Sequence, residues 1–504
     1  MRHGVLKRAA CTGATVTPTF LDVPALNALE ASTDLLVLGV RSPLDEDEAL
    51  NAAEARLVGL RDHLVARGFE ASAGEAVVLP TYGQLACGQI AVLGLGDGGP
   101  VAMRKAAGKL GTLARDQKAA IVAADLGTLD DATLAAVIEF ATIGNYRWDA
   151  HQPEKARTPA LSRLALSGAP AATRDGVAAR ATVRARWQAF ARDLVNRPAA
   201  DLTPTAMATA AEGLATLAGV TVHVTDFEAC KAQGMVGIVA VGQGSSEPGC
   251  LIHVSYQPSQ ARETIALVGK GVTFDSGGLS LKPSDAMQTM RCDMGGAATA
   301  LAAIGAIAEL GLPIRVEAFL PCVENMVAGN SYKLGDILHY RNGVTCEIHN
   351  TDAEGRLILA DALIEACAVP GVSRVVDLAT LTGAIIIALG SEFTGMFTAD
   401  DGLAAELDAA FASAGELAWR QPLHAPYKRL LKGTWSQIKN VGGREGGSIT
   451  AALFLQHFVT DDVRWAHLDI AGTAFADAPN EPYTAGGTGQ GVRTLVDWAS
   501  NLAT

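Results

Sequence analysis

The sequence lacks the cysteine pattern of a disulfide-stabilised protein. Its eight cysteines are spread through 504 residues without a CxxC spacing or a framework pattern. Disulfide-rich domains are short and cysteine-dense, so this distribution indicates reduced, mostly buried thiols in a cytoplasmic protein. The segment that begins Met1-Arg-His-Gly-Val-Leu-Lys-Arg8 has no continuous apolar region, which makes it a poor signal peptide.

Long apolar runs are missing too, and aromatic residues make up only 5% of the chain. The run Ala384 to Leu389 is far shorter than the roughly 20 residues that cross a bilayer, so no membrane partner is expected. Hydrophobic residues at 49% and charged residues at 18% are typical of globular proteins rather than disordered ones. At this length, two or three domains are the starting expectation.

Positive charge is in deficit: 40 basic against 53 acidic residues give a net charge of −13. Such a surface repels phosphate backbones and anionic lipids, which argues against nucleic acid as a partner. A local basic patch remains an alternative, in the arginine-rich stretch Arg180, Arg184, Arg186 and Arg192. We interpret this stretch as the solvated face of a helix.

Several catalytic motifs are absent. Neither HExxH nor GxSxG occurs, and Gly269-Lys270 is not followed by the Ser or Thr of a phosphate-binding loop. Residues 94–99 do fit GxGxxG between an expected strand and an expected helix. The next strand ends near Asp125, too far on for a ribose-binding acid, and Pro100 interrupts the helix start. We therefore interpret residues 94–99 as a tight turn.

Alternating strands and helices predict two α/β domains: a smaller N-terminal one and a larger catalytic one with a central mixed sheet flanked by helices. We expect the N-terminal domain, which would serve assembly or access, at residues 1–174. A linking helix over 175–199 would follow, because Pro198 and Pro204 bracket its end, and the catalytic domain would occupy 200–504. In the first domain the patterns predict strands and helices at 35–40, 49–66, 90–93, 101–115 and 119–123.

Chemistry-bearing residues gather where strands of the second half end. Asp275 follows one apolar strand, Asp293 precedes an apolar helix, and Asp352 and Glu354 lie between another strand and its helix. A fourth strand, residues 374–378, runs into a Thr- and Gly-rich turn. Because ligand sites of open α/β sheets lie beyond the carboxyl ends of the strands, one convergent pocket is expected.

Four unpaired carboxylates in one crevice would repel each other unless cations joined them. Two divalent ions could share bridging carboxylates, and an oxygen-rich site suits zinc, manganese or magnesium. Two such ions would also provide a hydroxide at neutral pH. Any one of these acids, taken alone, is more often a helix cap or a solvated turn residue, and Asp293 is well placed to be a cap. Their joint occurrence at successive strand ends favours the metal site.

Several ordered motifs between about residues 190 and 500 resemble those of the leucyl aminopeptidase family of metallopeptidases. The motif at 350–357, Asn-Thr-Asp-Ala-Glu-Gly-Arg-Leu, is similar to the family signature. Further blocks occur in the family order, at 268–278, 293–297, 377–383, 440–444, 446–450 and 465–473. The N-terminal domain resembles the family only loosely. The resemblance implies a metal-dependent aminopeptidase that releases N-terminal residues, Leu and other apolar ones preferred, from peptides with a free amino terminus.

The resemblance also implies metal ligands. Lys270, Asp275, Asp293 and Glu354 would hold the tighter-binding ion, and Asp275, Asp352 and Glu354 the more exchangeable one. A lysine can ligate only as the neutral amine, so burial and two dications would have to lower the pKa of Lys270. Cys292 adjoins a ligand, but we interpret it as a packing residue.

Two further positions match the catalytic residues of the family. Lys282 would polarise the scissile carbonyl and stabilise the oxyanion, and Arg356 would hold a bicarbonate ion that acts as general base. The substrate would be held by the free amine at Asp293 and by a set of residues implied with less force: Met290, Asn350, Thr380, Leu381 and Gly383.

The resemblance implies a homohexamer. Two other functions stay open at this point. Some bacterial members of the family also bind DNA, although the net charge argues against that role here. A catalytically silent peptide binder is the other alternative, against which every catalytic position of the pattern is filled.

Overall fold

The computed structural model describes residues 19–22, 32–154, 157, 161–168 and 174–503. Its contacts divide the chain into two compact units. The first unit is Met1–Ala189 with Ala478–Ala485, and the second is Phe190–Asp477 with Gly486–Thr504. Both are α/β units, as the sequence predicts, and the mixed sheet expected of the second unit is found in both. The segment Ala478–Ala485 packs with the first unit, whereas the sequence placed it in the second.

In the described part of the first unit, strands alternate with helices along the chain. These elements are β1 (Thr19–Asp22), β2 (Leu35–Val40), α1 (Glu48–Glu54), α2 (Leu60–Ala66), β3 (Ala76–Pro80), β4 (Gln89–Gly94), α3 (Pro100–Asp116), β5 (Ile121–Asp125), α4 (Asp131–Asn145), β6 (Arg163–Leu166) and the start of α5 (Arg174–Asn196).

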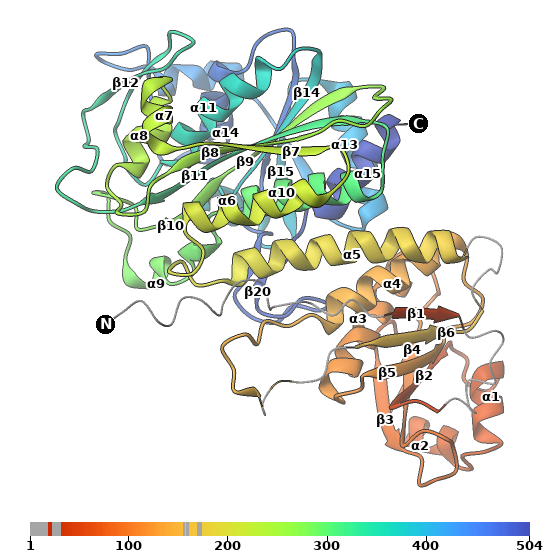
Figure 1. The fold of residues 1–504 in the computed structure, drawn as a ribbon. Helices are drawn as coiled ribbons and strands as arrows, with labels where there is room; N and C mark the ends of the chain where they lie inside the picture. The colour runs from red at the N-terminus through yellow and green to blue at the C-terminus, as the bar shows by residue number, and fades with distance from the viewer. Residues whose placement is uncertain (1–18, 23–31, 155–156, 158–160, 169–173, 504) are drawn as a thin grey trace, which may run out of the picture. The chain divides into compact units, whose positions relative to one another are not determined.

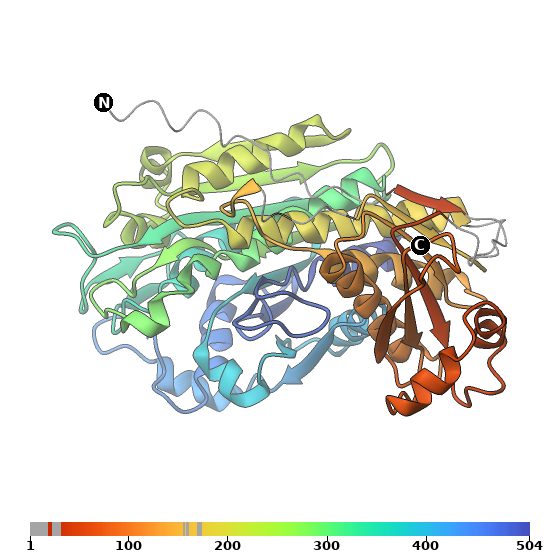
Figure 2. The same ribbon diagram turned by 90° about the horizontal axis from the view of Figure 1, so that it is seen from below.

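The strands of the first unit form one sheet in the order β1-β6-β5-β2-β4-β3. Neighbours pair in parallel except β3, which runs antiparallel to β4. Apolar side chains cover both faces of this sheet. Those of α3 and α4 pack on one face, and those of α1 and α2 pack on the other. Figure 1 and Figure 2 show how these helices are arranged around the sheet. The sheet is therefore buried on both sides.

Of two local predictions in the first unit, one is wrong and one is confirmed. The periodic stretch 49–66 forms two short helices rather than one, because the chain breaks at Gly59, whose φ of 88° is left-handed. The GxGxxG stretch forms a tight turn, as we expected: Gly96 and Gly98 have positive φ, and α3 begins at Pro100. The expectation that Pro100 interrupts the helix start is wrong, because proline suits the first helical position, where its missing N–H costs nothing.

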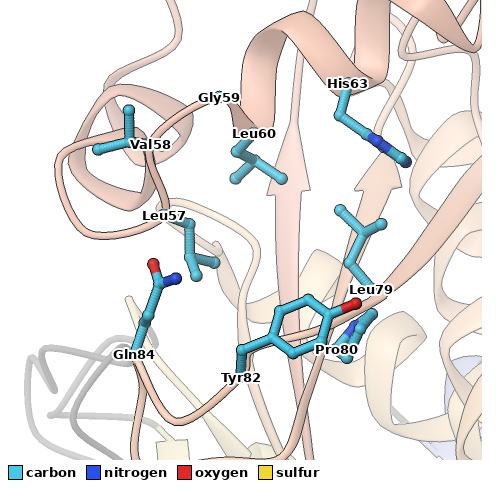
Figure 3. A pocket seen from close by; sticks show the side chains of 9 residues that line it. All are labelled: Leu57, Val58, Gly59, Leu60, His63, Leu79, Pro80, Tyr82 and Gln84. Atoms are coloured by element: carbon cyan, nitrogen blue, oxygen red, sulfur yellow. The ribbon is translucent and has the colours of Figure 1, made fainter.

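A pocket of about 250 Å³ lies within the first unit, between the α1–α2 region and the end of β3. Its walls are mainly apolar, and Figure 3 shows Leu60 and Leu79 pointing into the same space as the ring of Tyr82. None of the residues that the sequence predicts for catalysis lines this pocket.

The predicted linking helix is α5, which ends at Asn196, three residues before the predicted end at 199. The solvated-face interpretation of its arginines holds for Arg180, which is exposed. It is wrong for Arg192, which is 1% exposed and donates from Nε to the carbonyl of Gly487 at 2.8 Å. Arg184 is half-buried and pairs with Glu139. The stretch is therefore largely structural.

The second unit continues the strand–helix alternation. Its helices are α6 (Pro204–Glu212), α7 (Phe227–Ala232), α8 (Val236–Gly242), α9 (Ser284–Met287), α10 (Gly295–Glu309), α11 (Gly355–Cys367), α12 (Gly383–Leu389), α13 (Asp401–Ala414), α14 (Gly447–Leu455) and α15 (Val492–Ala503), with short 3₁₀ turns η3 (Gly213–Thr216), η4 (Met290–Cys292), η5 (Ala425–Leu431) and η6 (Gln456–Phe458). Its strands are β7 (Val220–Thr225), β8 (Cys250–Tyr256), β9 (Thr264–Gly269), β10 (Gly271–Asp275), β11 (Arg315–Asn325), β12 (Ile337–His339), β13 (Thr345–Glu347), β14 (Val372–Ala379), β15 (Phe393–Phe397), β16 (Leu417–Gln421), β17 (Ile438–Lys439), β18 (Arg464–Asp469), β19 (Phe475–Ala476) and β20 (Gly486–Gly487).

The main sheet of the second unit has the order β16-β15-β18-β14-β9-β11-β8-β7, with β10 also paired to β11. Its centre is parallel: β9, β14, β18 and β11 run the same way. Helices α10 and α15 lie on one face, and α11, α8 and α14 lie on the other (Figure 1). A smaller sheet has the strand order β12-β13-β17.

Within the described ranges, no helix combines the length and apolar character that a membrane crossing requires.

Candidate active site

The predicted site residues lie where elements of the second unit end. Lys270 separates β9 from β10, and Asp275 is the last residue of β10. Asp293 follows η4 and lies two residues before α10. Asp352 and Glu354 occupy the turn that leads into α11. Because the central strands of the sheet are parallel, the turns that follow their carboxyl ends lie at the same edge of the sheet.

Lys270 links two of the acids. Its Nζ lies 2.7 Å from Oδ1 of Asp293 and 2.8 Å from Oε1 of Glu354, and it donates to the carbonyl of Thr380 at 2.9 Å. All three side chains of this group are almost fully buried. The competing interpretation of Asp293 as a helix cap is not supported, because Met294 occupies the N-cap position of α10 and no side chain caps it.

Lys282 links the other two acids. Its Nζ lies 3.0 Å from Oδ2 of Asp275 and 2.6 Å from Oδ1 of Asp352. Asp275 is 2% exposed, whereas Asp352 is half-buried. The structure therefore brings all four carboxylates and both lysines together.

The closest part of this cluster has the geometry of a cation site. One carboxylate oxygen each from Asp275, Asp293 and Glu354 lies within 4.8 Å of the others. Within the part of the chain that the structure describes, the buried Oδ2 of Asp293 and Oε2 of Glu354 accept no hydrogen bond. Buried carboxylate oxygens normally have partners, so these two fit a metal ion. Cys292 is not part of the group, in line with the packing role expected of it.

Without a bound cation, the two lysines do not compensate fully for the burial of the carboxylates, as the pKa shifts of the acids show. Burial raises the pKa of Asp275 to about 6, with Glu354 adding to the shift and Lys282 opposing it. Burial also raises the pKa of Asp293 well above its ordinary range, despite Lys270. Burial also acts to raise the pKa of Glu354, but Lys270, Lys282 and a backbone hydrogen bond together outweigh it, so this pKa is lowered. A bound divalent cation would let all three carboxylates stay ionised.

Lys270 behaves as a cation when only the protein groups act on it. Burial lowers the pKa of Lys270, but the carboxylates of Asp293, Glu354 and Asp275 outweigh burial and raise the pKa above its usual range. Dications at the cluster would oppose those carboxylates. The neutral amine that a ligand role requires therefore depends on bound metal.

Arg356 lies in the first turn of α11 and is 7% exposed. Its Nη1 donates to the backbone carbonyl of Asn440 at 2.8 Å. Its Nε is also buried and has no hydrogen-bond partner among the described residues. Burial lowers the pKa of Arg356 to about 10, with Glu354 and Asp469 opposing the shift. A buried guanidinium with an unused donor is suited to hold a small anion.

The turn after β14 carries three of the predicted substrate residues, Thr380, Leu381 and Gly383, and contacts the cluster directly. The hydroxyl of Thr380 donates to Oδ1 of Asp293 at 2.7 Å. The N–H of Leu381 donates to Oδ1 of Asp469 at 3.1 Å, so this backbone donor is already used within the protein. Gly383 is exposed, and a Cβ placed there would meet no atom within 4 Å. Met290 is half-buried in η4.

Two buried amides near the acids have no role in the sequence-based prediction. Asn325 ends β11 and donates from Nδ2 to Oδ1 of Asp275 at 2.8 Å and to the carbonyl of Thr351 at 3.0 Å. Because Gly277 N also donates to Oδ1, the other oxygen of Asp275 is directed elsewhere. The position of Asn325 at a strand end was the available signal. Asn440 lies inside a motif that resembles the family, but nothing in its local pattern reveals a partner.

Comparison of the sequence with models of known protein families identifies the family to which the chain belongs. The model of the cytosol aminopeptidase family catalytic domain matches residues 189–496, and that of the N-terminal domain of the same family matches residues 37–155. The chain belongs to the cytosol aminopeptidase family. A probable cytosol aminopeptidase of Chlorobium limicola is 39% identical over 502 residues, covering 95% of this chain and 98% of that protein. One from a Synechococcus species is 42% identical over 483 residues, with 93% and 97% covered.

Solved structures give the same result. The bottromycin maturation enzyme BotP in complex with Mn aligns with a TM-score of 0.83 at 37% identity, over 94% of this chain and 100% of that one. A mutant of tomato leucine aminopeptidase aligns with a TM-score of 0.86 at 31% identity, over 96% and 97%. This member of the cytosol aminopeptidase family is thus a metal-dependent aminopeptidase, a hydrolase, with the two-domain architecture of the family.

Proposed function

We propose that the protein removes the first residue, preferably Leu or another apolar residue, from peptides with a free amino terminus, by using two divalent ions. The observation that carries this proposal is the convergence of four carboxylates and two lysines at one sheet edge, with buried oxygens of Asp293 and Glu354 left without partners. Lys270, Asp275, Asp293, Asp352 and Glu354 would hold the ions. When bound, two such ions lower the pKa of a water and polarise a carbonyl.

The lysine and the arginine of the site have separate tasks in this proposal. Lys282 would place its ammonium at the oxygen of the scissile carbonyl, where negative charge develops during attack. Among the protein groups burial lowers the pKa of Lys282, but Asp275 and Asp352 outweigh burial and raise it, so the side chain is charged at neutral pH. Arg356 would hold bicarbonate through its unused donor, and that anion would take a proton and pass it to the leaving amine.

Selection for a free amino terminus would come from Asp293. A free α-amine at this buried carboxylate gains a charge-assisted partner, whereas an acylated or internal amide would be desolvated without compensation. The side chain of the first residue would then lie near Met290, Thr380 and Gly383, where small and apolar walls favour Leu-like groups.

For the native setting we propose a cytoplasmic homohexamer that acts on peptides, with manganese, zinc or magnesium as its metal. Family membership, the acidic net charge of −13 and the BotP complex with Mn support this. The arginines of α5 give no support to nucleic acid as a partner, because Arg192 is buried and Arg184 pairs with Glu139. Light scattering should give six times the mass of one chain, and a monomer mass would refute the assembly.

The test compares leucylglycine with its N-acetyl form after the protein has been dialysed against chelator and reloaded with Mn²⁺, Zn²⁺ or Mg²⁺. We expect release of Leu from the free dipeptide only, and only with metal. Glu354→Gln should lose turnover, whereas Glu365→Gln, on the same helix but paired with Arg341 instead, should retain it. Cleavage of the acetylated peptide at a similar rate would contradict the exopeptidase proposal. Metal binding and peptide binding without turnover would instead indicate a silent peptide binder.

A further inference from the structure

Asn440 lies one residue beyond the short strand β17. This strand pairs in parallel with β13, with Cys346 opposite Ile438 and Glu347 opposite Lys439. The pairing continues one step, because the N–H of Asn440 donates to the carbonyl of Glu347 at 3.0 Å. Asn440 is fully buried. It therefore faces the chain at the point where β13 ends and the site turn begins.

Beyond the end of the strand pairing, the side chain of Asn440 forms the hydrogen bonds to the neighbouring backbone. Its Oδ1 accepts hydrogen bonds from the backbone N–H of His349 at 2.8 Å and of Asn350 at 3.3 Å. Its Nδ2 donates to the carbonyl of Asn350 at 2.6 Å. One amide thus satisfies both backbone groups of Asn350, as a neighbouring strand would.

The segment that this amide holds leads directly to the proposed ligands. The side chain of Asn350 accepts from the N–H of Asp352 at 2.9 Å, which shapes the turn toward Asp352 and Glu354. The backbone carbonyl of Asn440 accepts from Nη1 of Arg356 at 2.8 Å. One buried residue is therefore bonded to both ends of the segment that carries two ligands and the guanidinium.

We propose that Asn440 is a positioning residue, which sets the turn of Asp352 and the guanidinium of Arg356 relative to each other. It touches neither substrate nor metal and acts through these residues. The inference rests on the proposed function. Partners just outside a metal site typically contribute 10–100-fold in metal affinity or activity. Because Asp352 belongs only to the more exchangeable ion site, that site depends on Asn440 more than the tighter one does.

The small sheet has other connections that keep it together without this amide. The carboxylate of Glu347 accepts from the backbone of Thr434 at 3.1 Å and of Trp435. The hydroxyl of Thr345 accepts from the N–H of Gln437 at 3.0 Å. A variant that lacks only the amide of Asn440 is therefore expected to fold.

The experiment uses Asn440→Ala and Asn440→Ser, because alanine removes both polar atoms of the amide and serine replaces them by a single oxygen. Asn342→Ala is the matched control: Asn342 lies in the turn between β12 and β13 and bonds to the backbone of His457 and Val344, but it is exposed and these bonds do not reach the site turn. Mn²⁺ binding is followed by electron paramagnetic resonance, folding by circular dichroism, and kcat and KM with leucylglycine.

We expect one of two Mn²⁺ ions to bind about 10–100-fold more weakly in both Asn440 variants, and kcat at saturating Mn²⁺ to fall by a similar factor. KM should change less than kcat, because Met290, Thr380 and Gly383 are not held by Asn440, and Asn350 is the predicted substrate residue whose backbone bonds to it. The control should match the wild type in all these measurements.

Wild-type Mn²⁺ affinities and kcat in the Asn440 variants would overturn the inference. So would a loss of secondary structure in both, because Asn440 would then be a determinant of the fold. If the wild-type protein itself neither binds Mn²⁺ nor releases Leu, the proposed function fails first, and the two failures are thereby distinguished.

Discussion

At the scale of single residues, the site balances four carboxylates against two ammonium groups. Lys270 pairs with Asp293 and Glu354, and Lys282 pairs with Asp275 and Asp352. Four negative and two positive charges leave a net charge of −2 among these groups. Two dications would reverse that sign and would favour a neutral Lys270. In the proposed mechanism the two lysines would therefore differ in function: Lys270 would become a ligand, and Lys282 would stay charged.

Replacement of Lys282 by Ala tests that difference. Loss of an ammonium that stabilises developing negative charge should reduce kcat by roughly 10²–10³, while Mn²⁺ still binds. Lys333→Ala serves as control, since Lys333 is an exposed lysine of the same unit that bonds to a backbone carbonyl. Steady-state kinetics with Mn²⁺ titration measures both. An unchanged kcat in the Lys282 variant would contradict its role.

A second residue-scale prediction concerns Asp361, which is buried on α11 and accepts from the N–H of Ile238 at 2.9 Å. Burial raises the pKa of Asp361 to about 7, against these backbone hydrogen bonds. Between its ordinary value of 3.8 and about 7, the folded protein keeps a proton that the unfolded chain has released. Raising the pH through this range therefore lowers stability, by at most about 1.4 kcal/mol per pH unit.

Asp361→Asn removes this titration and keeps an oxygen acceptor. Its thermal midpoint, measured by scanning calorimetry relative to that of the wild type, should rise as the pH increases from 4 to 7. A difference that stays constant over this range would show that the carboxyl is not held protonated.

The sequence predicted which charged residues lie together, but it did not predict the hydrogen-bond partners of the buried amides Asn325 and Asn440. Asp275, Asp293, Asp352 and Glu354 could be placed together because successive strand ends meet at one sheet edge, a rule that needs no alignment. The partners of Asn325 and Asn440 lie 26 to 91 residues away along the chain. Side-chain hydrogen bonds of that range leave no local pattern.

At the scale of elements, the start of α11 lies close against the side chain of Lys270. The helix begins at Gly355, immediately after the N-cap residue Glu354. A Cβ at Gly355 would lie 2.5 Å from Cε and 2.7 Å from Nζ of Lys270, which is pinned between two carboxylates. Only glycine allows the helix to begin this close to the proposed ligand.

Gly355→Ala should therefore displace Lys270 and lower activity and Mn²⁺ affinity by at least about tenfold, as expected for a misplaced ligand. Alanine is the better helix former, so the helical signal in circular dichroism should persist. Gly213→Ala is the control, because a Cβ there meets no atom within 4 Å. Wild-type Mn²⁺ affinity in the Gly355 variant would show that Lys270 can move freely.

Element boundaries followed from the sequence where one signal dominated. The strand at residues 35–40 is β2, and the helix expected at 101–115 is α3, one residue longer at each end. The stretch 49–66 was wrong as a single helix, because apolar periodicity continues through Gly59 while the backbone there does not. Periodicity reports which face is buried but not whether the helix is continuous.

At the scale of the whole molecule, sequence order and packing diverge once. The chain returns to the first unit at Ala478–Ala485, where Glu481 pairs with Lys109 at 2.9 Å. Such a short segment has no distinctive composition. A prediction that assigns each domain one continuous range of residues also cannot include a segment that returns to the first unit. The two-domain α/β class, in contrast, followed from chain length and from the alternation of strands and helices.

The central claim is that Lys270, Asp275, Asp293, Asp352 and Glu354 hold two divalent ions in one site. Crystals of the Mn²⁺-loaded protein, with anomalous scattering recorded on both sides of the manganese absorption edge, test it most directly. The account predicts two anomalous peaks per chain, both within coordination distance of these residues and joined by Asp275 and Glu354. A single peak, or peaks only at other side chains, would contradict it.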